Sequence, residues 1–138
     1  MPGEHFFDSN ILIYAFAANE PRGDQAELLI STGGVIGVQV LNEFTNVVRK
    51  KLSWDWPRID AALAVIGDFL GTARPLTSGI HAGAVVLARN HSLSFYDALI
   101  VAAAIEAKCR ILYSEDFQNG QKFGSLVVKN PFVSLPES

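Results

Sequence analysis

The sequence is poor in the residues that mark secreted, membrane-spanning and zinc-binding proteins. Its single cysteine, Cys109, excludes an internal disulfide and a thiolate zinc site, and we expect it to be a small core residue. The longest uninterrupted apolar runs cover only residues 11–18 and 98–105, whereas a membrane helix needs about 20 residues. No Lys or Arg precedes Arg22, so the charged start of a secretory leader is missing. A cytoplasmic protein is therefore expected.

An excess of positive charge is also missing, since 11 Lys and Arg stand against 14 Asp and Glu, for a formal net charge of −3. This balance excludes a general basic coat for nucleic acid and leaves room for a local basic patch. Arg49, Lys50 and Lys51 form such a patch at the end of a predicted helix and are candidate contacts for phosphate groups. Positive charge there also has a structural explanation, because it stabilises the helix dipole. The nearby Trp54 and Trp56 are expected to pack rather than to stack on bases.

The motifs of several common phosphate and hydrolase enzymes are missing as well. There is no Gly-x-x-x-x-Gly-Lys-Ser/Thr loop, no Gly-x-Gly-x-x-Gly after a strand and no Gly-x-Ser-x-Gly elbow. A phospho-aspartyl enzyme would resemble the chain at Asp8, but Asn10 stands where such enzymes usually carry a second Asp. These absences exclude P-loop, dinucleotide-binding and covalent serine mechanisms.

Short apolar runs alternate with longer helical patterns along a chain that is 49% apolar, enough to bury a core. The length suffices for one domain, covering residues 1–138. Strands are predicted over residues 5–7, 35–37, 74–76, 110–113 and 126–129, and helices over residues 9–18, 24–31, 39–51, 58–70, 78–90 and 95–107. This alternation predicts an α/β protein, a three-layer α/β/α domain around a short-stranded parallel sheet. Because the strands are short, a mainly α protein is the alternative.

Four carboxylates occupy positions where acidic residues are costly to place. Asp8 and Asp116 each follow a predicted strand, and the carboxyl ends of parallel strands form the edge where ligands gather. Glu43 lies about 100° from the centre of the apolar stripe of its predicted helix, so its side chain can lean toward the core. Asp97 lies in the first turn of the most apolar helix, where its neighbours offer little solvation. We infer that the four side chains converge.

Gathering four carboxylates costs free energy twice, because each loses water and each repels the others. One divalent cation neutralises half of their formal charge, and two neutralise it fully. Oxygen ligands without Cys or paired His suit Mg²⁺ or Mn²⁺ better than zinc. A metal held in this way lowers the pKa of a bound water and neutralises phosphate, so the pattern predicts hydrolysis at phosphorus without a side-chain nucleophile.

Each of the four acids also has a structural explanation when it is taken alone. Ser94 and Asp97 fit a helix capping box, and Asp8 is placed to cap the helix that follows it. Glu43 fits a solvated helix position, and Asp116 fits a polar turn. The case for a site therefore rests on all four acids together.

The segments around these acids resemble the four acidic motifs of the PIN-domain ribonucleases. They read Phe-Asp-Ser-Asn-Ile-Leu at 7–12, Asn-Glu-Phe at 42–44, Tyr-Asp-Ala at 96–98 and Ser-Glu-Asp-Phe at 114–117. Order, spacing and chain length all agree, and the resemblance covers essentially the whole chain. Residues 112–117 and 130–132 look particularly like the VapC toxins of bacterial toxin–antitoxin pairs. Each motif is short, so the ordered set carries the resemblance.

The resemblance implies a PIN fold and a Mg²⁺- or Mn²⁺-dependent endoribonuclease that hydrolyses RNA with metal-activated water. It implies that four acids are catalytic residues and metal ligands: Asp8, Glu43, Asp97 and, as the most variable member, Asp116. Ser9 and Ser114 match positions where the family places a hydroxyl near the site. A homodimer and a VapB-type antitoxin that lays a peptide across the active site are further implications. A catalytically weak binding module of the same fold, acting through protein partners, is the alternative.

Overall fold

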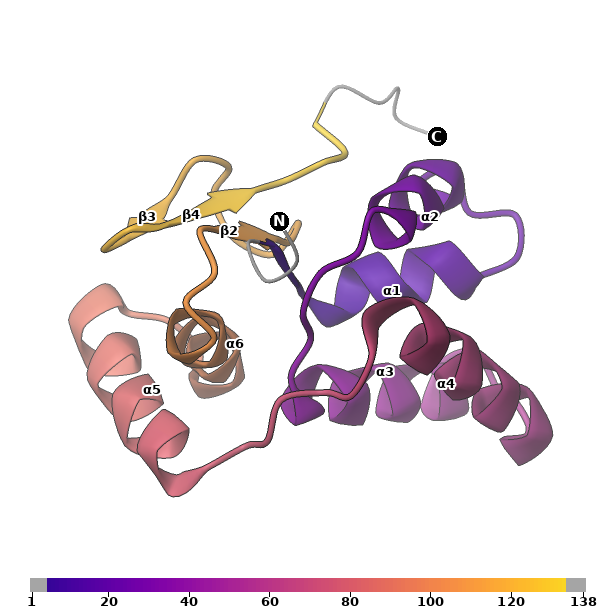
Figure 1. Ribbon diagram of the computed structural model, residues 1–138, viewed down its shortest axis with the longest axis horizontal. Coiled ribbons are helices and arrows are strands. Elements are labelled where there is room, and N and C mark those ends of the chain that lie inside the picture. The colour runs from indigo at the N-terminus through magenta and orange to yellow at the C-terminus, as the bar shows by residue number, and fades with distance from the viewer. Residues whose placement is uncertain (1–4, 134–138) are drawn as a thin grey trace.

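The computed structural model describes residues 5–133, and Figure 1 shows the arrangement of their helices and strands. In chain order the elements are β1 (His5–Phe7), α1 (Ser9–Phe16), α2 (Gly23–Ser31), α3 (Val38–Lys50), α4 (Trp56–Leu70), α5 (Ser78–His91), α6 (Phe95–Glu106), β2 (Ile111–Tyr113), β3 (Lys122–Phe123) and β4 (Leu126–Lys129). The predicted domain of residues 1–138 extends past the described residues at both ends, so those ends stay a prediction.

The predicted helices are present, and local capping explains where two of them begin. Asp55 precedes α4, and its carboxylate accepts a hydrogen bond of 2.9 Å from the backbone N–H of Arg58. Pro57 stands in the first turn of α4, where its missing N–H costs nothing. The hydroxyl of Ser94 caps α6 by accepting from the backbone N–H of Asp97 at 3.3 Å. The capping role predicted for Ser94 is therefore confirmed.

The sheet has four strands in the order β1-β2-β4-β3 and is mostly parallel. β1 pairs in parallel with β2, with His5 opposite Ile111, and β2 pairs in parallel with β4, with Ile111 opposite Val127. β3 was not predicted, and it runs antiparallel to β4 at the sheet edge. The α/β class is confirmed, and the sheet is mixed rather than wholly parallel.

Two predicted strands, at residues 35–37 and 74–76, are reduced to single bridges, the first to β1 and the second to Gly37. Val35 pairs in parallel with Phe6, and Gly37 pairs in parallel with Arg74. The pairing stops there because α3 begins at Val38, directly after Gly37. These positions still belong to the sheet edge, although they form no extended strand.

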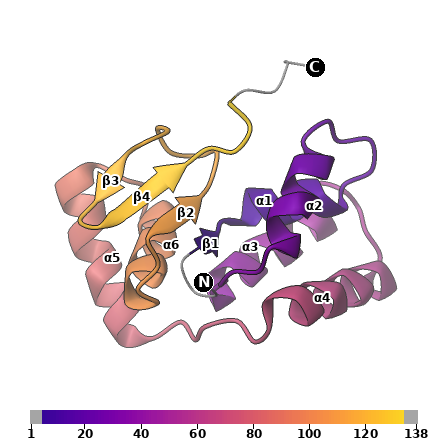
Figure 2. The ribbon, with the colours of Figure 1, turned by 45° about the horizontal axis from the view of Figure 1, so that its top comes forward.

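The helices form two groups that flank the sheet, in agreement with a three-layer α/β/α arrangement. α5 packs along α6 on one side, and α1 packs against α2 and α3 on the other, with β1 between the groups (Figures 1 and 2). The residues of α6 from Ala98 to Ala104 are all buried, as expected for a helix that is apolar all round. Cys109 is a buried core residue, as predicted. Among residues 5–133, no helix is both long and apolar enough to cross a membrane.

Candidate active site

The carboxyl ends of β1 and β2 bring Asp8 and Ser114 together, although they are 106 positions apart in the sequence. The backbone N–H of Asp8 donates to the carbonyl of Tyr113 at 3.0 Å, which continues the β1–β2 ladder by one residue. The hydroxyl of Ser114 then donates to Oδ2 of Asp8 at 2.7 Å. Both side chains are buried, with Asp8 1% exposed. The two strand ends therefore hold a carboxylate inside the protein.

Asp8 also caps α1, as its structural interpretation predicted. Its Oδ1 accepts a hydrogen bond of 2.7 Å from the backbone N–H of Ser9. Both carboxylate oxygens of Asp8 thus accept one hydrogen bond each, and both bonds favour the ionised form.

Glu43 reaches this cluster from α3, through the side chain of Ser9. The hydroxyl of Ser9 donates to Oε1 of Glu43 at 3.2 Å, and the amide of Gln39 donates to Oε2 at 3.3 Å. Gln39 is buried, and it lies one helical turn before Glu43, so α3 itself orients the carboxylate. Glu43 is half-buried rather than freely solvated, which contradicts the solvated alternative.

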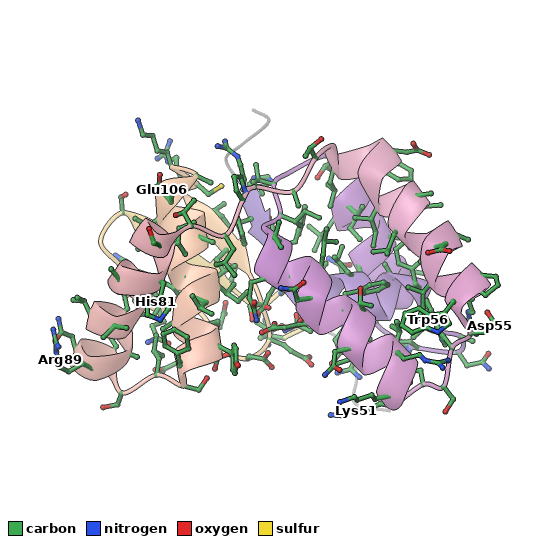
Figure 3. The ribbon with its side chains drawn as sticks, turned by 90° about the horizontal axis from the view of Figure 1, so that it is seen from below. Lys51, Asp55, Trp56, His81, Arg89 and Glu106 are labelled. Atoms are coloured by element: carbon green, nitrogen blue, oxygen red, sulfur yellow. The ribbon has the colours of Figure 1, made fainter. Side chains whose placement is uncertain are left out.

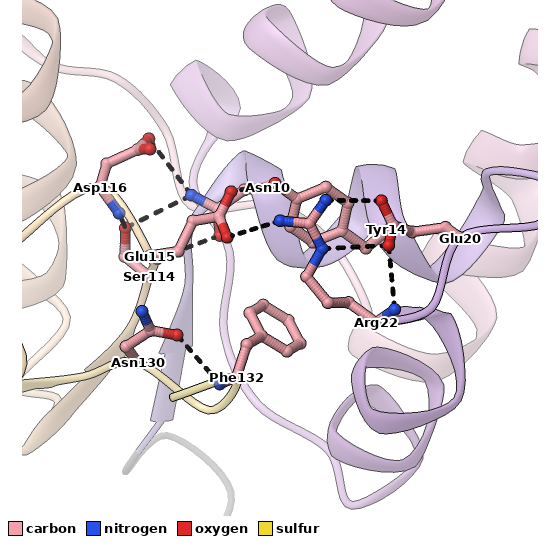
Figure 4. A network of polar contacts seen from close by, with 9 residues as sticks. All are labelled: Asn10, Tyr14, Glu20, Arg22, Ser114, Glu115, Asp116, Asn130 and Phe132. Carbon is pink, nitrogen blue, oxygen red and sulfur yellow. Dashed lines mark hydrogen bonds and ion pairs between the residues drawn. The ribbon is translucent and has the colours of Figure 1, made fainter. Parts of the chain in front are cut away.

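Asp116 is held by Asn10, a residue for which the sequence predicted no role. The amide of Asn10, in the first turn of α1, donates to Oδ2 of Asp116 at 3.2 Å and to the hydroxyl of Ser114 at 3.4 Å (Figure 4). Its carbonyl oxygen accepts from the backbone N–H of Glu115 at 3.4 Å. The backbone N–H of Asp116 also donates to Ser114 Oγ at 3.1 Å. Asn10 therefore fixes the turn that carries Asp116.

Asp97 enters the site from the N-terminus of α6, and its charge acts on two of the other acids. It raises the pKa of Glu43 and of Asp116 by like-charge repulsion, in addition to the larger effect of burial on each. The charge of Asp97 therefore acts on Glu43 and Asp116, and hydrogen bonds through Ser9, Ser114 and Asn10 link the other three acids. The assignment of the four acids as metal ligands stays a prediction.

The environment of Asp8 makes it the most perturbed acid of the cluster. Burial raises its pKa to about 7, against the lowering effect of the hydrogen bonds from Ser114 and Ser9. The charges of Asp116 and Glu43 raise the pKa of Asp8 further. A buried acid that titrates near neutral pH, surrounded by other acids, is typical of functional sites.

A second polar network ties the Asp116 turn to α1 and α2. The phenol of Tyr14 donates to Glu115, and the guanidinium of Arg22 donates to the other Glu115 oxygen at 3.1 Å (Figure 4). Arg22 also pairs with Glu20 at 2.7 Å and lies over the Tyr14 ring, with Cζ 3.9 Å from its centroid. This network could not be predicted from the sequence, because Tyr14 and Arg22 are about 100 positions from Glu115.

The tail motif at residues 130–132 has a structural role in the same region. The side-chain oxygen of Asn130 accepts from the backbone N–H of Phe132 at 2.9 Å, which forms a tight turn. The Phe132 ring then packs edge-on against Tyr14, with centroids 5.5 Å apart (Figure 4). These contacts anchor the tail beside the network that holds Glu115.

The basic cluster of Arg49, Lys50 and Lys51 lies at the end of α3, and its three members are exposed. Arg49 is engaged within the protein, since it donates to the carbonyl of Trp54 at 2.8 Å and lies over the Trp56 ring at 4.7 Å. Trp54 is buried, which confirms the packing prediction for it, whereas Trp56 is exposed. Figure 3 shows Lys51 and Trp56 at one end of the molecule, opposite His81 and Arg89.

The acid cluster offers only oxygen donors, the ligand type that Mg²⁺ and Mn²⁺ prefer. Within residues 5–133, no three His, Cys, Asp or Glu side chains are arranged to hold a metal ion as they stand. The oxygens of Asp8, Glu43 and Asp116 instead accept hydrogen bonds from hydroxyl and amide groups. The donor chemistry of the cluster therefore fits a hard divalent cation.

Comparison with known proteins identifies the family. The sequence model of the PIN domain matches residues 5–119, so the chain belongs to the PIN domain family. A comparison with curated protein sequences gives no significant match.

Solved structures with the same fold include several toxins. The VapC20 toxin of Mycobacterium tuberculosis, described as cleaving the sarcin–ricin loop, is 18% identical with a TM-score of 0.68 and covers 81% of this chain and 89% of its own. A toxin–antitoxin complex from Klebsiella pneumoniae is 18% identical with a TM-score of 0.69, over 92% of this chain and 97% of that chain. VapBC2 of Rickettsia felis, bound to a promoter DNA fragment, is 18% identical with a TM-score of 0.69. The match covers 94% of this chain and 98% of that chain. These similarities show the fold.

Proposed function

We propose that this protein is a metal-dependent endoribonuclease and the toxin component of a VapBC-type toxin–antitoxin pair. The observation that carries the proposal is a buried carboxylate, Asp8, whose pKa burial raises to about 7 and on which the charges of Asp116 and Glu43 also act. Such a cluster is costly unless a cation compensates it. Membership of the PIN family and structural similarity to VapC20, a described RNA-cleaving toxin, support the same conclusion.

In this proposal Asp8, Glu43, Asp97 and Asp116 hold one or two Mg²⁺ or Mn²⁺ ions. When bound, the metal lowers the pKa of a water molecule and neutralises the phosphate and the leaving oxygen. Ser114 and Ser9 hold the Asp8 and Glu43 carboxylates in place by hydrogen bonds. Asn10 holds Asp116 in the same way. The acids act as ligands, and no protein side chain attacks the phosphorus.

The proposal extends to the partners of the protein. A VapB-type antitoxin inhibits the enzyme, and two copies of the chain form a homodimer. Two structural neighbours are toxin–antitoxin or VapBC complexes, which supports an antitoxin partner. With RNA as its substrate, the protein is expected to act in the cytoplasm. Positive charge for the RNA phosphates comes from Arg49, Lys50 and Lys51.

RNA cleavage by the purified protein, with Mg²⁺, with Mn²⁺ and with a chelator, tests the proposal. We expect cleavage only with metal, and none from Asp97→Asn, which keeps the backbone N–H that Ser94 caps. Expression of the wild type without an antitoxin should arrest growth, and expression of Asp97→Asn should not. Metal-independent cleavage, or equal cleavage by both proteins, contradicts the proposal. A protein that neither cleaves RNA nor is stabilised by millimolar metal supports the binding-module alternative.

Asn10→Ala tests whether the turn that carries Asp116 must be held in place. The change removes the hydrogen bonds to Asp116, Ser114 and the Glu115 backbone, so we expect kcat to fall roughly tenfold, as for outer partners of metal ligands. Steady-state kinetics with an RNA substrate measure kcat and KM separately. Tyr14→Phe is the control, because it removes only the phenol–Glu115 bond and leaves Asn10 intact. A wild-type kcat for Asn10→Ala rules out this role.

A further inference from the structure

A groove of about 450 Å³ opens directly beside the acid cluster. Its walls come from one face of α3 and from the first turn of α6, and they consist of Gln39, Asn42, Glu43, Asn46 and Tyr96. Glu43 belongs to both the groove and the acid cluster, and Tyr96 immediately precedes Asp97. A molecule whose phosphate lies at the acids therefore extends naturally into this groove.

The α3 wall of the groove consists of three neutral amide side chains and one carboxylate. Gln39, Asn42, Glu43 and Asn46 are spaced i, i+3, i+4 and i+7, which places them on one face of the helix. The Asn42 amide donates to Gln39 Oε1 at 3.4 Å, and Gln39 donates in turn to Glu43. Asn42 and Asn46 are exposed, whereas Gln39 is buried. The two asparagines therefore offer donor and acceptor groups to a ligand.

The opposite wall is an exposed aromatic ring. Tyr96 is 62% exposed and lies in the first turn of helix α6, whose residues 98–104 are buried. Its ring has the neighbouring Phe95 ring on one side, with centroids 5.9 Å apart in an edge-on contact. Aromatic rings exposed beside polar groups are the usual platforms on which single-stranded RNA bases stack.

The charge of the site decides which part of a nucleic acid enters the groove. Glu43 lines the groove, and Asp97 follows Tyr96, so an anionic phosphate or an acidic peptide is repelled there. A nucleobase is neutral, has two flat faces and carries donors and acceptors along its edge. Tyr96 and the asparagines match these features one by one.

We propose that the groove holds one unstacked nucleobase of the RNA, next to the phosphate that is cleaved. Tyr96 stacks on the face of the base, and the amides of Asn42 and Asn46 hydrogen-bond its edge. The proposal rests on the proposed ribonuclease function and adds a site that selects which RNA sequence is cut. It gives a role to the exposed Asn42 and Asn46 of α3, which belong to neither the core nor the acid cluster.

The test measures binding first, by fluorescence anisotropy with a labelled single-stranded RNA of random sequence and Mg²⁺. The Asp8→Asn background prevents cleavage during the measurement. We expect Tyr96→Leu to weaken binding about tenfold or more and Tyr96→Phe to preserve it, because stacking needs the ring and not the hydroxyl. Asn46→Ala should weaken binding, whereas Asn90→Ala, a matched exposed helix asparagine on α5, should not.

Mapping the cleavage sites of otherwise wild-type enzyme in an RNA pool then tests selection. We expect Tyr96→Leu to raise KM and Asn46→Ala to broaden the preference at one nucleotide, with metal dependence unchanged in both. If the wild type cleaves RNA and Tyr96→Leu matches it in affinity, KM and cleavage sites, the base site is ruled out. If the wild type itself neither binds nor cleaves RNA with metal, the ribonuclease function fails and the base site fails with it.

Discussion

Asp8→Asn will abolish metal-dependent RNA cleavage and will, at the same time, stabilise the metal-free protein at pH 8. Cleavage is lost because the buried ligand at the centre of the acid cluster becomes a neutral amide. Mutation of residues that only hydrogen-bond to metal ligands lowers metal affinity or activity about 10- to 100-fold. Loss of a ligand itself should therefore lower the cleavage rate at least about 100-fold. Stability rises because the amide removes a buried charge that Asp116 and Glu43 repel.

The pH dependence of this gain follows from the pKa of Asp8, which is raised from 3.8 to about 7 by folding. The stability that goes with this raised pKa is fully present below pH 3.8 and is lost as pH rises through 7. Three pKa units correspond to about 4 kcal/mol, so the wild type should lose up to that amount between pH 4 and pH 8. Asp8→Asn should not lose it.

Urea unfolding of both proteins at pH 5, 6, 7 and 8, in chelator, measures the effect as a gap in the free energy of unfolding that widens with pH. Asp60→Asn, at an exposed position of α4, is the matched control and should leave both cleavage and the pH profile unchanged. A destabilised Asp8→Asn at pH 8 would mean that the carboxylate contributes more as the cap of α1 than it costs by burial.

Mg²⁺ or Mn²⁺ will raise the melting temperature of the wild type at pH 8 and will have little effect at pH 5.5. Below pH 7 the metal must displace a proton from Asp8, so its affinity falls about tenfold for each pH unit below the pKa. Metal at about 100 times its Kd adds about 2.7 kcal/mol to the free energy of unfolding. For a domain of this size, that corresponds to a rise in melting temperature of roughly 10 °C.

Melting scans across this pH range, with each metal and with chelator, check the prediction. Asp8→Asn supplies the control, because it lacks both the ligand and the titrating proton, and its melting temperature should not respond to metal. A metal-induced rise of equal size at pH 5.5 and pH 8 would show that the metal binds elsewhere on the protein.

The helices were predictable because their signals are local. The apolar stripe of α3 contains Val40, Phe44 and Val48, and all three are buried in the structure. β3 was missed because two residues, Lys122 and Phe123, are too few to show a period, and only their partner β4 makes them a strand. The strands expected at 35–37 and 74–76 were overestimated, because apolar composition does not reveal that α3 starts at Val38.

The acidic residues of the candidate site could be predicted from the sequence, whereas the residues that hydrogen-bond to them could not. Asp8 and Asp116 follow strands, and parallel strands place such residues at one edge. Asn10 and Glu115 gave no comparable signal, because a side-chain hydrogen bond between residues about 100 positions apart leaves no pattern in a single sequence. The exposure of Tyr96 could not be predicted for another reason. Which side of an apolar helix faces solvent depends on how that helix packs in the folded protein.

The hydrogen bond between Ser114 and Asp8 also has a consequence for the order of events during synthesis. The ribosome makes the α1 half of the site first, and the Ser114 half follows 106 residues later. At about 5–20 residues per second, a nascent chain spends roughly 5–20 s with Asp8 exposed and its partners unmade. A chain that has not yet reached Ser114 therefore carries Asp8, Glu43 and Asp97 but lacks Asp116 and an assembled site. Under the proposed function, an incomplete chain has no assembled ribonuclease site.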